Sequence, residues 1–379
     1  MTTSMETLTL ALDGPGRARG NAHGESLREA IREGLDRWRD SLARDVAGSL
    51  DDYISELLNR TSFTVAIDRW APDLGEEVIG LAEGAGVDRQ TMLAFQLVDE
   101  EWWFRRNRRL GLVVGEKCSV VGIPGTEQNA PLLAQNLDIP TWCDGLQVLL
   151  QITLPDSDLK ASVFSYAGLI ALTGLNDRSI AVTVNALMQL NPSPRGLPVA
   201  FVVRALLAKR TFEDAERLLL EIEHASGQAY TLGSRDRIVG YECSARGTCR
   251  YRPREPSGVL CHSNHPLAND DQQLFRDVSR LIDPALQAAS RSNTERRLAS
   301  LVAQTEGLTP GPGVDEVAAI LRSHDDRGAS ICAHDSGGTM AFTAWSVIYE
   351  LGERPRAHFT VGPPCRSEFR TAELTRGQT

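Results

Sequence analysis

Long hydrophobic runs are missing from this sequence of 379 residues. No apolar stretch reaches the roughly 18 residues that a transmembrane helix needs, so no membrane span is expected. Positive charge is also in deficit, because 40 Lys and Arg face 50 Asp and Glu, for a net charge of −10. This balance argues against a nucleic-acid or anionic-membrane partner. The first residues are too polar for a secretory signal, so we expect a cytoplasmic location.

Cysteine is sparse as well. The seven cysteines are an odd number and are widely scattered, without the density of a disulfide-stapled domain. Most of them should be reduced thiols that pack as small apolar residues.

Motifs for metals and cofactors are absent. His262 and His265 have ligand-like spacing, but no CxxC or HExxH motif accompanies them. Cys243 and Cys249 flank a segment that suits a hairpin turn better than a metal site. No glycine-rich segment has the spacing of a dinucleotide or Walker loop. The sequence therefore predicts neither a metal nor a cofactor.

The residues before 118 predict helices. Between Gly24 and Val46 apolar residues recur every three or four positions, which indicates an amphipathic helix. Further helices are predicted over 50–58 and over 89–104, the latter with Asp88 as its N-cap. Hydrophobic content of 42% and charged content of 24% are typical of a globular protein.

After residue 118 short β-branched segments predominate, bounded by Gly, Pro, Asn or Asp, as strands are. Helices are predicted at 198–208, at 212–224 with Thr211 as its cap and Asp214 completing a capping box, and within 270–304. The predicted strands are CSVVGI, PLLAQN, LQVLLQITL, ASVFSYAG, SIAVTV, QAYTLG, RIVGYEC, GVLCHSN, ASICAH, AFTAWSVIYEL and RAHFTVG. The fold class is therefore α+β, with a helical N-terminal third against a sheet-rich remainder.

Cys118 lies where the helical part gives way to the first strand. A cysteine is nucleophilic as a thiolate, and because a free thiol has a pKa of about 8.5, a base must accept its proton. One candidate base is a histidine. The other is the α-amine that cleavage of the Lys117–Cys118 bond would release. The charged residues 105–109, Glu116 and Lys117 predict a solvated loop, which is where a chain can be cut.

A series of short motifs supports the second arrangement. Together they resemble the acyl-CoA:6-aminopenicillanic acid acyltransferase family of N-terminal-nucleophile hydrolases. In chain order the motifs are GPGRARGNAHGESLREAI (14–31), Cys118-Ser119, QNLD (135–138), VNAL (184–187), HSNH (262–265), SICAH (330–334) and GPPC (362–365). The resemblance implies an αββα sandwich, self-cleavage before the cysteine, and acyl transfer or amide hydrolysis through a thioester. It also implies an α-subunit of residues 1–117 that packs on a β-subunit of residues 118–379, as an α/β heterodimer from one chain.

The resemblance also implies roles for individual residues. Cys118 would be the nucleophile, Asn264 the donor to the oxyanion, and Asp138 a carboxylate that holds or orients the new ammonium group. From the residues alone, a turn at a strand end is the favoured role of Asp138. Supporting roles fall to Asn136, Asn185, Ser330 and His334.

Two positions depart from the family pattern. Related chains commonly have an arginine directly after Ser-Ile-Cys, whereas this chain has Ala333 and His334. Lys117 stands where a small residue would ease the strained turn of an N-to-S acyl shift. We therefore expect slower processing and an altered substrate class.

The expected partners are a small-molecule acyl donor, such as an acyl-CoA or an N-acyl amide, and an amine acceptor. Two alternatives remain. One is a cysteine hydrolase that uses His334 or His262 as base in an unbroken chain. The other is a catalytically inactive relative that acts as a binding protein.

Overall fold

The computed structural model describes residues 8–108, 118–155, 158–253, 257–280, 284–324, 330–334 and 341–374. The helices are α1 (Gly16–Ser26), α2 (Arg28–Leu42), α3 (Leu50–Asn59), α4 (Phe63–Trp70), α5 (Pro72–Ala85), α6 (Arg89–Phe95), α7 (Val98–Asn107), η1 (Thr141–Cys143), α8 (Val199–Leu207), α9 (Phe212–Glu221), α10 (Gln273–Ser279), α11 (Pro284–Glu306) and α12 (Val314–Leu321). The strands are β1 (Leu8–Leu12), β2 (Ser119–Ile123), β3 (Leu132–Pro140), β4 (Gln147–Thr153), β5 (Lys160–Tyr166), β6 (Thr173–Asn176), β7 (Ala181–Ala186), β8 (Gln228–Gly233), β9 (Ile238–Ser244), β10 (Gly247–Tyr251), β11 (Leu260–His262), β12 (Ala341–Glu350), β13 (Arg356–Val361) and β14 (Arg370–Glu373). None of the described helices is both long and apolar enough to cross a membrane.

Within the described residues the strands form two sheets. The larger has the order β1-β4-β5-β6-β7-β8-β9-β10, and the smaller has the order β11-β2-β3-β12-β13-β14. The sheets contact each other through β7 and β8 of the larger sheet and β2 and β3 of the smaller sheet. Helix α8 covers the larger sheet at β6 and β7, and α11 and α12 cover the smaller sheet at β2, β3, β11 and β12. The four layers confirm the predicted αββα sandwich.

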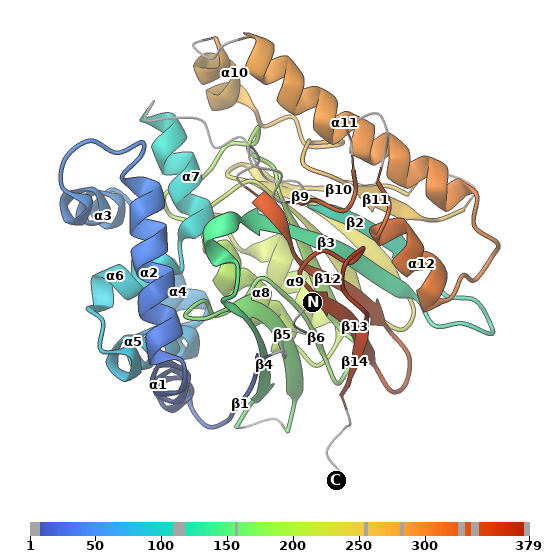
Figure 1. Cartoon of the computed structure of the whole chain (residues 1–379), viewed down its shortest axis with the longest axis horizontal. Coiled ribbons are helices and arrows are strands. Elements are labelled where there is room, and N and C mark those ends of the chain that lie inside the picture. Colours follow the sequence, from blue (N-terminus) through green and yellow to red (C-terminus); the bar gives the residue numbers. More distant parts are fainter. Residues whose placement is uncertain are drawn as a thin grey trace.

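The helices α1–α7 form a separate group at one side of the sheets, coloured blue to teal in Figure 1. The amphipathic pattern predicted over 24–46 is confirmed in α2, although that helix is shorter than predicted. The apolar residues of the predicted pattern are all buried: Leu27, Ile31, Leu35, Trp38, Leu42 and Val46. The caps predicted at Asp88 and Thr211 are also confirmed, since each side chain accepts a backbone N–H of the first turn.

Three local predictions were wrong or incomplete. The helix predicted over 89–104 is divided into α6 and α7, where the side chain of Gln96 bonds to the backbone of Gly168 and Ile170. The described part of the predicted strand ASICAH, residues 330–334, is not a strand, and the side chain of Asn136 donates to the carbonyl of Ile331 there. Strands β1, β6 and β14 and helices α1, α4, α5 and α12 were not predicted, and β1 joins the larger sheet by parallel pairing with β4.

Candidate active site

Cys118 directly precedes β2 and lies at the wall of a small pocket of about 50 Å³. The side chain is buried, with 5% of its surface exposed. The pocket wall is mostly apolar and includes several aromatic rings. Its residues are Gln96, Val98, Asp99, Trp102, Cys118, Leu137, Ile139, Pro140, Trp142, Cys143, Tyr166, Leu169, Ala171, Leu172, Val184, Ala186, Val199 and Ala200. The surface beside the sulfur is therefore mostly apolar.

The pocket is built jointly by the N-terminal helices and by the two sheets. Gln96, Val98, Asp99 and Trp102 come from the region of α6 and α7. Asp99 brings a carboxyl group to this wall, and Gln228 donates to it at 3.0 Å. Burial raises the pKa of Asp99 above its ordinary value, and the bond from Gln228 offsets part of that rise. Residues from both sides of position 117 thus line one cavity.

Two donors from different layers hold the backbone of Cys118. The side-chain amide of Asn185, on β7, donates to the Cys118 carbonyl oxygen at 3.1 Å. Arg297, on α11, donates to the same oxygen at 2.8 Å. The Cys118 sulfur lies 3.8 Å from the carbonyl oxygen of Asp138. Because the carbonyl is fixed from two sides, the nitrogen and the side chain on the same Cα are also oriented.

Arg297 connects the residues around Cys118. Its guanidinium donates to the hydroxyl of Ser119 at 3.2 Å and to the side-chain oxygen of Asn264 at 2.9 Å. Burial lowers the pKa of Arg297 to about 10, against the opposing effects of Asp138 and Cys118. The guanidinium therefore remains charged at neutral pH. A cation in this position favours negative charge on the Cys118 sulfur.

Asp138 lies on β3 and is fully buried. The hydroxyl of Thr343, on the neighbouring β12, donates to its carboxylate at 2.6 Å. That hydroxyl also accepts the backbone N–H of Ala333 at 2.9 Å. The carboxylate is thus positioned from the segment that carries the SICAH motif.

Asn264 follows β11 and is also buried. One N–H of its side chain donates to the carbonyl of Ala186 at 3.1 Å, and its backbone N–H donates to Thr294 at 2.8 Å. With Arg297 on its side-chain oxygen, the amide is fixed in orientation. An amide side chain carries two N–H groups, and the bond to Ala186 uses one of them.

The remaining predicted site residues lie around this group. Asn136 donates to the carbonyls of Leu321 and Ile331, and so joins β3 to α12 and to the SICAH segment. Ser330 is half-buried at the start of that segment. His334 contacts Cys365 and His324. Lys117 lies outside the described residues.

His262 is engaged elsewhere. Its ring nitrogens lie 2.8 Å from the Glu242 carboxylate and 2.7 Å from the carbonyl of Ser263. Burial raises the pKa of Glu242, but the bonds from His262, Leu267 and Ala268 outweigh it and leave that pKa below its ordinary value. These contacts bind the imidazole to a carboxylate rather than to a thiol.

Arg297 and Thr343 were not predicted as site residues. Arg297 is one of several arginines in the polar stretch RSNTERR, and no local pattern distinguishes it from its exposed neighbour Arg296.

The family model for acyl-coenzyme A:6-aminopenicillanic acid acyl-transferase matches residues 126–364. The match contains Asp138, Asn185, Asn264 and Arg297 and begins after Cys118. No curated protein matches the chain.

Among solved structures, a mutant conjugated bile acid hydrolase from Clostridium perfringens is 10% identical, with a TM-score of 0.41, over 69% of this chain and 98% of that one. Penicillin V acylase from Agrobacterium tumefaciens is 15% identical, with a TM-score of 0.41, over 64% of this chain and 82% of that one.

Proposed function

The chain belongs to the acyl-coenzyme A:6-aminopenicillanic acid acyltransferase family, and from that premise we propose that it is a self-processing enzyme with Cys118 as N-terminal nucleophile. The enzyme takes an acyl group from a thioester or amide and passes it to an amine or to water. One observation carries the proposal: Cys118 lies at the wall of an apolar pocket, its carbonyl held by Asn185 and Arg297.

Processing releases the base. The Cys118 sulfur attacks the carbonyl carbon of Lys117, the C–N bond breaks, and the nitrogen takes up a proton to become the free amine of Cys118. Water then hydrolyses the resulting thioester, which frees the Cys118 thiol and leaves a carboxylate on Lys117. The products are residues 1–117 and 118–379.

The acyl-transfer step uses the same two atoms. The α-amine of Cys118 accepts the thiol proton, and the sulfur attacks the carbonyl carbon of the donor. The second side-chain N–H of Asn264 donates to the oxyanion, and Arg297 keeps that amide in place. The ammonium returns its proton to the leaving thiol or amine. An acceptor amine or water then attacks the thioester and restores the thiol.

The pocket supports an apolar acyl group as the substrate class. Trp102, Trp142 and Tyr166 contribute aromatic surface, and Asp99 is a carboxyl group in this wall. Because burial raises the pKa of Asp99, its neutral form persists to higher pH than in water. A mostly apolar wall binds hydrocarbon or aromatic acyl chains in preference to charged ones.

Mass spectrometry of the purified full chain tests the proposal. Under denaturing conditions the wild type should give two fragments, one of which begins at Cys118, and under native conditions one assembly. Cys118→Ala should remain a single inactive chain. Incubation with a panel of acyl-CoA and N-acyl amide donors should add one acyl mass to the fragment that begins at Cys118.

Cys143→Ala is the matched control, because Cys143 lines the same pocket. Burial raises the pKa of the Cys143 thiol well above its ordinary value, which keeps it protonated. This variant should be processed and acylated like the wild type. An intact chain that becomes acylated at Cys118 would contradict self-processing. It would favour the alternative of a cysteine hydrolase that uses a histidine as base in an unbroken chain. Acylation of neither cysteine by any donor would favour the inactive binding protein.

A further inference from the structure

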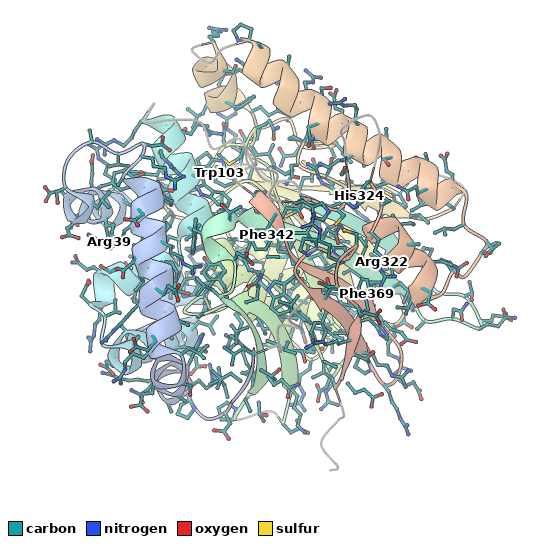
Figure 2. The ribbon with its side chains drawn as sticks, in the orientation of Figure 1. Arg39, Trp103, Arg322, His324, Phe342 and Phe369 are labelled. Atoms are coloured by element: carbon teal, nitrogen blue, oxygen red, sulfur yellow. The ribbon has the colours of Figure 1, made fainter. Side chains whose placement is uncertain are left out.

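Two cysteines and two histidines meet away from the nucleophile. They are His324 after α12, Cys332 and His334 before β12, and Cys365 after β13. One ligand atom from each of the four lies within 4.8 Å of all the others. Figure 2 labels His324 next to Arg322, which caps the end of α12.

The distances within this cluster match those of a tetrahedral site. The Nε2 atoms of His324 and His334 lie 3.4 Å apart. The Nε2 atom of His334 lies 3.1 Å from the Cys365 sulfur and 3.8 Å from the Cys332 sulfur. Around one zinc ion, tetrahedral geometry places two nitrogens about 3.3 Å apart and a nitrogen and a sulfur about 3.6 Å apart, and the observed nitrogen–sulfur distances lie on either side of that value. The four atoms can therefore surround a single ion.

We propose that His324, Cys332, His334 and Cys365 bind one Zn²⁺. Two thiolates and two imidazoles are the ligands that zinc prefers, and four protein ligands leave no position for water or substrate. The site is thus structural rather than catalytic. Binding releases the two thiol protons to solvent, and the complex of Zn²⁺ with two thiolates is electrically neutral.

The backbone around the cluster is already joined. The N–H of Cys332 donates to the carbonyl of Ser323 at 3.1 Å, and Arg322 donates to the carbonyl of Pro364 at 3.1 Å. These bonds bring the three ligand-bearing segments together before any ion binds. A metal bound to them therefore needs less rearrangement of the chain.

The proposed ion would also stabilise the residues that position the Asp138 carboxylate. Ala333 stands between two of the ligands, and its N–H and carbonyl both bond to Thr343. Thr343 in turn donates to the Asp138 carboxylate. The significance of this connection for catalysis rests on the proposed function, whereas zinc binding does not.

Metal analysis of the tag-free full chain, expressed with zinc and kept reduced, tests the site. We expect one zinc ion per chain. Co²⁺ in its place should give the visible absorption of a tetrahedral thiolate site. Cys365→Ser and His324→Ala replace exposed ligands, so they should fold, and each should lose the bound zinc and the thiolate absorption.

Cys249→Ser is the matched control, since Cys249 is a half-buried cysteine on β10, outside the cluster. It should keep one zinc ion per chain. Three results would overturn the site: a wild type without zinc, equal zinc in Cys365→Ser and wild type, or a Cys332–Cys365 disulfide in non-reducing peptide mapping.

Discussion

At the scale of single residues, the position of Cys118 depends on bonds to its own carbonyl. Asn185 reaches that oxygen from the larger sheet, and Arg297 reaches it from the helix layer over the smaller sheet. Arg297 also holds Asn264. One guanidinium therefore connects the proposed nucleophile with the proposed oxyanion donor.

Arg297→Met should lower kcat by a factor of about 10²–10³, because it releases Asn264 and removes the cation beside Cys118. Arg297→Lys should have a kcat between those of Arg297→Met and the wild type. An ammonium group keeps the positive charge but not the planar arrangement of N–H donors in a guanidinium. Steady-state kinetics on the best donor would measure both.

Arg296→Met serves as the control, because that neighbour on the same helix is exposed. It should leave kcat unchanged. If the kcat of Arg297→Met were within threefold of the wild-type value, the guanidinium would have no role in the active site.

At the scale of elements, α1 and α5 pack with their backbones in contact. A Cβ on Gly20 would lie 1.8 Å from the carbonyl oxygen of Glu77, and a Cβ on Gly80 would lie 2.1 Å from that of Arg17. The helices approach this closely only where side chains are absent. The glycines of the segment 14–31 thus have a packing role beside the family resemblance.

Gly20→Ala should destabilise the fold by about 1–3 kcal/mol, since the new methyl forces the helices apart. This would occur although alanine favours an isolated helix by about 1 kcal/mol over glycine. Urea unfolding would measure the difference.

Gly307→Ala is the matched control, because its Cβ would lie at an ordinary 3.6 Å from the nearest atom. Its stability should stay within about 0.5 kcal/mol of the wild type. A Gly20→Ala protein as stable as the wild type would contradict the close packing.

At the scale of the whole molecule, the N-terminal helices are attached to the sandwich by buried charge and by a strand. Glu77, on α5, pairs with Arg19 on α1 at 2.7 Å and with Arg204 on α8 at 2.8 Å. Burial raises the pKa of Glu77, but the two arginines, Arg204 and Arg19, lower it by a larger amount. The pKa of Glu77 is therefore below its ordinary value. Strand β1 continues the larger sheet. These contacts would hold the two fragments together after cleavage at residue 117.

Buried histidines make the fold sensitive to acid. Burial lowers the pKa of His23 from 6.5 to about 4. Glu77 raises this pKa and Arg204 lowers it, and both effects are smaller than that of burial. The unfolded chain therefore binds a proton at this residue below pH 6.5, whereas the folded chain does so only near pH 4. Stability should fall as the pH decreases through this window.

His23→Gln should flatten the pH dependence of the urea midpoint between about pH 6.5 and 4, because the titrating group is gone. An unchanged slope in His23→Gln would contradict the buried neutral imidazole.

Much of the fold was predictable because local signals agree with the final structure. The apolar spacing of α2, the caps at Asp88 and Thr211, and the short β-branched strands after residue 118 are local features. Gln96 and the SICAH segment were mispredicted because distant partners decide their conformation. No local pattern reports such partners.

The sequence by itself determined the α+β class, most of the strands after residue 118, the family, and Cys118, Asp138, Asn185 and Asn264 as candidate site residues, since each of these residues lies in a short recognisable motif. Only the tertiary structure brought Arg297 and Thr343 to them and gathered His324, Cys332, His334 and Cys365. The physical reason is that these contacts join residues far apart in the chain, and packing of the layers, not spacing, sets their distance.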